Sequence, residues 1–234
     1  MDTPTSKRPH FKINNKKYNF GANNNPIFME IRRHLLDRDT FFEISLNKSS
    51  PLFVSSNQGE IALSYLMAAY SIHRPFVNDD FDYLKQNIRQ IGCKTRSLNN
   101  SLLISYEVRY LTSQEQETQI KHGLDEIMVS LCVNDKKSDL LKTKLIYDFI
   151  LSNVEYDFKY ANHSAYNALF DKKAVCEGCA ALLYRMLCFA NVPCRIITGK
   201  GLQDRHAWNI AKIGKYWYNL DVTWDLYCRK KDRV

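Results

Sequence analysis

The chain lacks long hydrophobic runs and an export-like start. No stretch approaches the roughly 20 consecutive apolar residues of a transmembrane helix, so we expect no membrane span. Residues 1–10 are polar and basic without an apolar core, so we expect no secretory signal peptide. These absences predict a cytoplasmic protein, although a secreted parent that had lost its signal would present the same sequence.

The chain also lacks a paired cysteine framework and a nucleic-acid-binding motif. Its seven cysteines are an odd number and do not show the spacing of small disulfide-stapled scaffolds, so reduced thiols are the simpler interpretation. The net charge of +8 is concentrated partly near the two ends, and no nucleic-acid-binding motif interleaves aromatic residues with these charges. We interpret these charge runs as solvated tails and expect no nucleic-acid partner.

The chain has enough apolar residues for a folded core, since 45% of its 234 residues are apolar. We predict a flexible lead-in over residues 1–25, an N-terminal accessory α/β region over residues 26–135 and a catalytic domain over residues 136–234. Apolar periodicity and capping signals predict helices at residues 27–36, 60–72, 81–91, 112–131 and 138–150. Alternation predicts strands at residues 41–46 and 102–111. This first half contains no chemical motif.

The second half contains a cysteine in a setting that suits a nucleophile. Cys176 lies where an extended stretch is predicted to enter a helix over residues 177–190. At a helix N-terminus a thiol faces unpaired backbone N–H groups and the positive end of the helix dipole, which lowers its pKa from about 8.5 towards neutrality. Gly178 is expected to leave room for a substrate backbone near this thiol.

A histidine and an aspartate follow in a predicted hairpin. Strands over residues 206–213 and 216–224 flank Gly214 and Lys215, and a two-residue turn there pairs Ile213 with Tyr216. Counting back, His206 and Asp221 project from the same face as diagonal neighbours, within reach of a hydrogen bond. A thiol, an imidazole and a carboxylate are the nucleophile, base and orienting acid of thiol catalysis.

Several of these segments together resemble the transglutaminase-like superfamily of cysteine enzymes, and in particular its microbial protease-like branch. The matching segments are residues 144–157, 163–169, 174–178 (AVCEG), 206–209 (HAWN) and 221–225 (DVTWD). The resemblance implies a papain-like α+β fold in which the helix bearing Cys176 packs on an antiparallel sheet bearing His206 and Asp221. It implies no metal and no organic cofactor.

The predicted function is cysteine-dependent acyl transfer on peptide or glutamine amides by a transglutaminase-like protease or other hydrolase. A protein cross-linking transglutaminase and a non-catalytic module with the same fold are the alternatives. The Cys176 backbone N–H is the natural oxyanion donor, with Tyr166 or Asn167 as candidates for a second. Trp208 is a candidate for the cleft wall. The expected partner is a protein or peptide substrate, and the oligomeric state stays open.

Cys179 departs from the family pattern, which often has tyrosine at this position. It either fills the space of that tyrosine or forms a disulfide with Cys176 that switches the enzyme off. A zinc site built from Cys176, Cys179, Cys194 and His206 is a further alternative, although only one pair has the close spacing of structural zinc sites. Amide hydrolysis on a glycoprotein is another, and the sequence shows no carbohydrate-binding aromatic cluster.

Overall fold

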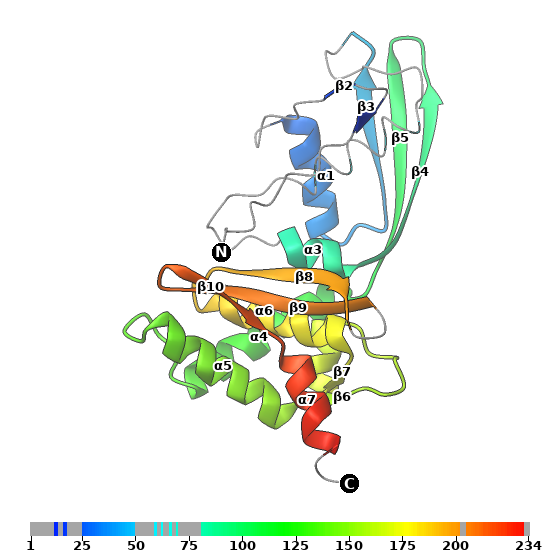
Figure 1. Cartoon of the computed structure of the whole chain (residues 1–234). Helices are drawn as coiled ribbons and strands as arrows, with labels where there is room; N and C mark the ends of the chain where they lie inside the picture. The colour runs from blue at the N-terminus through cyan, green and yellow to red at the C-terminus, as the bar shows by residue number, and fades with distance from the viewer. Residues whose placement is uncertain are drawn as a thin grey trace. The chain divides into compact units, whose positions relative to one another are not determined.

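The computed structural model describes residues 12–13, 16–17, 25–49, 59, 62, 66, 69, 81–201 and 205–231. The chain divides into two compact units, residues 1–73 with 90–109 and residues 74–89 with 110–234 (Figure 1). The boundary predicted at residues 135 and 136 falls inside the second unit. Most of the predicted lead-in lies outside the described residues, which include the short strands β1 (Lys12–Ile13) and β2 (Lys16–Lys17).

The first unit contains a helix and a three-stranded sheet. Asn25 caps α1 (Pro26–Leu36) by accepting a hydrogen bond of 3.0 Å from the Ile27 N–H. The sheet order is β3-β5-β4, with β3 (Phe41–Asn47) antiparallel to β5 (Ser101–Tyr110) and β4 (Ile88–Ser97) on its other side. Of the helix predicted over residues 60–72 only three residues are described, and all three are helical and buried: Ala62, Leu66 and Ala69.

The helix predicted over residues 81–91 ends earlier than expected. The observed α3 spans Phe81–Asn87, and the chain continues directly as β4. The Asn87 amide group binds a distant residue, since its Nδ2 donates to Thr112 Oγ1 at 2.6 Å and its Oδ1 accepts from the Thr112 N–H at 3.1 Å. This tertiary contact ends the helix where local periodicity would have continued it.

The second unit contains a second three-stranded sheet and four longer helices. The sheet is antiparallel with the order β10-β9-β8, formed by β8 (Cys194–Lys200), β9 (Arg205–Ile213) and β10 (Tyr216–Leu220). The helices are α4 (Gln114–Ser130), α5 (Asp139–Asn153), α6 (Cys176–Phe189) and α7 (Val222–Lys231). A parallel pair, β6 (Glu155–Tyr156) with β7 (Lys173–Ala174), and the π-helical turn η1 (Asn167–Asp171) complete the unit.

The central helix of this unit is α6, which runs beside the sheet (Figure 1). Nine of its residues are buried, and Asn209 of β9 donates its side-chain amide to the Ala180 carbonyl at 3.1 Å. Helices α4 and α5 contribute to the same hydrophobic core, which is why α4 belongs to this unit. The α+β class is therefore confirmed, as is a Cys176-bearing helix packed against the sheet that carries His206.

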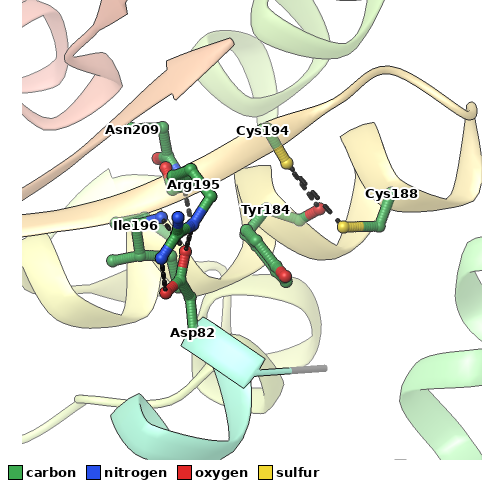
Figure 2. A network of polar contacts seen from close by, with 8 residues as sticks. Asp82, Tyr184, Cys188, Cys194, Arg195, Ile196 and Asn209 are labelled. Carbon is green, nitrogen blue, oxygen red and sulfur yellow. Dashed lines mark hydrogen bonds and ion pairs between the residues drawn. The ribbon is translucent and has the colours of Figure 1, made fainter. Parts of the chain in front are cut away.

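A buried ion pair fixes β8 to α3 (Figure 2). Asp82 accepts hydrogen bonds from Arg195 Nε at 2.6 Å, from Arg195 Nη2 at 2.9 Å and from the Ile196 N–H at 2.9 Å. The Asp82 side chain is only 7% exposed, so its charge depends on these donors for stabilisation. Within the described residues, no helix has the length and apolar character needed to cross a lipid bilayer.

Candidate active site

Cys176 is the first residue of α6 and follows the extended residues of β7 and Val175. The strand-to-helix junction predicted for this cysteine is therefore confirmed. Its side chain is half-buried, and the backbone N–H groups of Glu177 and Ala207 are near enough to its sulfur to stabilise the thiolate form. Because Ala207 directly follows His206 in β9, the sulfur lies beside the strand segment that carries the imidazole.

The predicted lowering of the thiol pKa is wrong for the resting site. Burial raises the pKa of Cys176 above its ordinary value, and the negative charges of Glu177 and Asp221 raise it further. The backbone N–H groups of Ala207 and Glu177 oppose this rise without reversing it. The resting sulfur is therefore a thiol at neutral pH, and its use as a nucleophile requires a base.

His206 and Asp221 are joined by a hydrogen bond of 2.7 Å between the imidazole Nε2 and the carboxylate Oδ2. The hairpin register is the predicted one, since Tyr216 pairs with Ile213. The strand predicted to run to residue 224 is wrong, however, because β10 ends at Leu220 and α7 starts at Val222. Asp221 caps that helix, since its Oδ1 accepts a hydrogen bond of 3.1 Å from the Trp224 N–H.

Trp208 supports the imidazole from one side. Its ring stacks on His206 with centroids 5.9 Å apart and planes 18° apart, and its Nε1 donates to Asn219 Oδ1 at 3.1 Å. A Cβ atom at Gly199 would lie 3.0 Å from the Trp208 ring, so the glycine allows that ring to lie close to β8. Since His206 Nε2 faces Asp221, Nδ1 is the ring nitrogen that can exchange a proton with another group.

Residues 128–222 match the transglutaminase-like superfamily, and this range includes Cys176, His206 and Asp221. The match identifies a transglutaminase-like domain in this part of the chain. The transglutaminase-like domain lies entirely within the second unit, from the end of α4 to the start of α7.

Similar proteins include the kyphoscoliosis peptidases of mouse and human. The chain is 29% identical to the mouse protein over 132 residues and 28% identical to the human protein over 146 residues. These matches cover 49% and 55% of this chain but 20% and 22% of the relatives, so the chain matches about a fifth of their length. A solved structure of a TGase shares 13% identity and a TM-score of 0.43, covering 82% of this chain and 56% of that one.

Three other predicted residues of the transglutaminase-like domain have local structural contacts. The Asn167 side chain accepts hydrogen bonds from Ser164 and donates to Asp171 Oδ2 at 2.8 Å. Tyr166 packs on Phe170 with ring centroids 4.8 Å apart. Gly178 is buried, and a Cβ atom there would lie 2.8 Å from Ser164 O, so protein rather than open space surrounds it. The room expected at Gly178 for a substrate is therefore absent.

A contact between a histidine and a glutamate next to the cysteine was missed by the sequence interpretation. His163 Nδ1 lies 2.5 Å from Glu177 Oε2, and His163 Nε2 lies 3.0 Å from the Tyr160 carbonyl oxygen. Glu177 follows Cys176 directly, and its proximity to the thiol was evident in the sequence. The histidine partner comes from 14 residues upstream, and no local pattern indicates the pairing.

The remaining cysteines of this unit have separate surroundings. Cys179 is buried with its sulfur 3.7 Å from the Ala174 carbonyl, and burial raises its pKa to about 12. The Cys188 and Cys194 sulfurs lie 3.7 Å apart at the other end of α6 (Figure 2). In the part of the chain that the structure describes, no three His, Cys, Asp or Glu side chains gather as a metal-binding group.

Proposed function

We propose that this chain is a cysteine-dependent acyl-transfer enzyme that hydrolyses amides of a peptide or protein substrate. Cys176 is the nucleophile, His206 the base and Asp221 the group that orients the base. The observation that carries the proposal is the 2.7 Å hydrogen bond between His206 Nε2 and the Asp221 carboxylate, in a strand whose next residue, Ala207, has its backbone N–H near the Cys176 sulfur. The match of residues 128–222 to the transglutaminase-like superfamily supports it.

The proposed reaction starts with a protonated thiol, because the pKa of Cys176 is raised. His206 Nδ1 takes the thiol proton as the sulfur attacks the carbonyl carbon, so that a carbon–sulfur bond forms and the carbonyl oxygen becomes an oxyanion. The Cys176 backbone N–H, unpaired at the helix N-terminus, is a donor for this oxyanion. His206 then gives its proton to the departing amine as the carbon–nitrogen bond breaks, which leaves a thioester.

Water completes the proposed cycle. His206 takes a proton from water as the water oxygen attacks the thioester, and it gives that proton to the sulfur as the carbon–sulfur bond breaks, which releases a carboxylic acid and regenerates the thiol. A lysine amine in place of water would give a cross-link, which is the alternative outcome. The peptidase names of the mouse and human relatives favour hydrolysis, on a match that covers a fifth of their length.

The test is incubation of the protein with a defined mixture of glutamine-containing peptides and a primary amine, followed by mass spectrometry. Peptide cleavage or deamidation indicates hydrolysis, and an amine adduct indicates cross-linking chemistry. We expect Cys176→Ser and His206→Ala to abolish turnover, whereas His122→Ala, an exposed histidine on α4, retains it. A folded wild-type protein that shows no turnover, or turnover that survives Cys176→Ser, contradicts the proposal.

A further inference from the structure

Five aromatic side chains form a cluster on the surface of the second unit, which we call the aromatic patch. Three are substantially exposed, with Phe158 at 44%, Tyr160 at 65% and Trp224 at 47%. Tyr156 and Tyr227 are half-buried and lie between them. The patch joins the end of β6 and the loop after it to α7, which lie side by side in Figure 1. Contiguous exposed apolar surface of this kind is a feature of binding sites.

The rings of the patch meet mostly edge to face. Tyr156 is perpendicular to three neighbours, with interplanar angles of 77° to Phe158 and 88° to both Tyr160 and Tyr227. Phe158 is tilted by 42° to Tyr227, and Trp224 is nearly parallel to Tyr227 at 25°. Edge-to-face packing presents ring edges beside ring faces, which suits contact with an apolar side chain better than stacking with the flat face of a sugar ring.

The patch adjoins both parts of the proposed active site. On one side Tyr156 pairs in register with Ala174, two residues before Cys176, and burial and then nearby groups including Cys176 raise the pKa of its phenol. On the other side the Trp224 N–H donates to the Asp221 carboxylate that holds His206. A peptide with its amide at the Cys176 sulfur would therefore have these rings within reach of a neighbouring side chain.

The carboxylates that border the patch already have hydrogen-bond donors. Asp157 accepts from the backbone N–H groups of Lys159, Ala161 and Asn162. Asp225 accepts a hydrogen bond of 2.7 Å from the Tyr147 hydroxyl. Recognition at this surface therefore depends on apolar contact more than on an unsatisfied charge.

We propose that the aromatic patch is a substrate subsite that binds a large apolar side chain next to the reactive amide of a peptide. This inference rests on the proposed function and adds a substrate preference to it. Removal of a phenylalanine side chain from water against such rings is worth roughly tenfold or more in selectivity over glycine.

The test uses two peptidyl acyloxymethyl ketones that differ only in having phenylalanine or glycine next to the reactive carbonyl. The rate of covalent modification of Cys176 is measured by mass spectrometry. We expect the phenylalanine probe to react about tenfold faster or more with the wild type. Phe158→Ser and Tyr160→Ser should lose most of this preference. Their matched controls are Phe189→Ser, exposed by 44% on α6, and Tyr216→Ser, exposed by 58% on β10.

The outcomes separate this inference from the proposed function. Modification of Cys176 at equal rates by both probes overturns the subsite and leaves the chemistry intact. The subsite is also overturned if the two control variants lose the preference as fully as the patch variants do. If neither probe modifies Cys176 in the folded protein, the proposed function fails and the inference fails with it.

Discussion

The substitution Asp221→Asn gives the sharpest test of the proposed mechanism, because this residue has two separate contacts. Its Oδ1 accepts the Trp224 N–H that caps α7, and its Oδ2 lies 2.7 Å from His206 Nε2. Asparagine can preserve only one of these arrangements. Its carbonyl oxygen must accept from the Trp224 N–H, because the opposite orientation of the amide would place the asparagine NH2 group against that N–H donor. The NH2 group therefore faces His206 Nε2.

The consequence is a change of imidazole tautomer. An NH2 group opposite Nε2 requires that nitrogen to be an acceptor, which places the ring proton on Nδ1. His206 then cannot use Nδ1 to take the thiol proton. In an unrelated serine protease the equivalent change leaves the geometry intact and lowers kcat by roughly 10⁴-fold. We therefore expect kcat to fall by about 10³- to 10⁴-fold, which corresponds to about 4 to 5.5 kcal/mol of transition-state stabilisation.

Two measurements separate this effect from loss of structure. Turnover of the peptide identified in the substrate screen reports catalysis, and intrinsic fluorescence reports unfolding of the second unit, which contains all three tryptophans. Asp221→Asn should retain the cap and unfold like the wild type, whereas Asp221→Ala should lose about 1 kcal/mol. The control Asp225→Asn should retain most of the activity. If Asp221→Asn turns over substrate at the wild-type rate in a folded protein, the orienting role is refuted.

Three substitutions and one oxidation test other parts of the second unit. Asp82→Ala should lower the free energy of unfolding by about 3 kcal/mol, because it leaves an arginine that is 26% exposed without its buried acceptor. Asp148→Ala removes an exposed i,i+4 ion pair and should lower the free energy of unfolding by less than roughly 0.5 kcal/mol. Equal losses of stability in Asp82→Ala and Asp148→Ala would contradict the claim that burial makes the first pair more important. Glu177→Gln removes a negative charge that raises the pKa of the neighbouring active-site thiol. Iodoacetamide should therefore modify that thiol a few-fold faster at neutral pH. An unchanged rate of modification would show that this charge is unimportant for the thiol pKa. Glutathione disulfide should join Cys188 to Cys194, whose sulfurs are 3.7 Å apart, and peptide mapping that finds a different cysteine pair would contradict this expectation.

Local sequence patterns were sufficient for much of the second unit. The two-residue turn at Gly214 and Lys215 set the hairpin register, and alternation along its strands then brought His206 and Asp221 to one face. The junction at Cys176 was equally local, since an extended stretch meets an apolar helix there. These features are determined by residues that are close together in the sequence, because the residues of a turn and the alternation of side chains along a strand act locally.

Features that depend on distant contacts could not be predicted in this way. The ion pair between Asp82 and Arg195 joins residues 113 positions apart, and the aromatic patch combines rings from β6, the following loop and α7. The raised pKa of Cys176 likewise depends on burial in the folded protein. A helix N-terminus lowers a thiol pKa only when desolvation and nearby carboxylates do not outweigh it.

The end of β10 shows how one residue links local structure to the proposed chemistry. Tyrosine, tryptophan and valine around Asp221 favour a continuing strand, yet the carboxylate accepts the Trp224 N–H and the chain becomes helical at Val222. This cap fixes one carboxylate oxygen, and the other is thereby directed at His206 Nε2. The orientation of the proposed base therefore depends on the start of α7, the helix that also supplies Trp224 and Tyr227 to the aromatic patch. Displacement of α7 would disturb the base and the proposed subsite together.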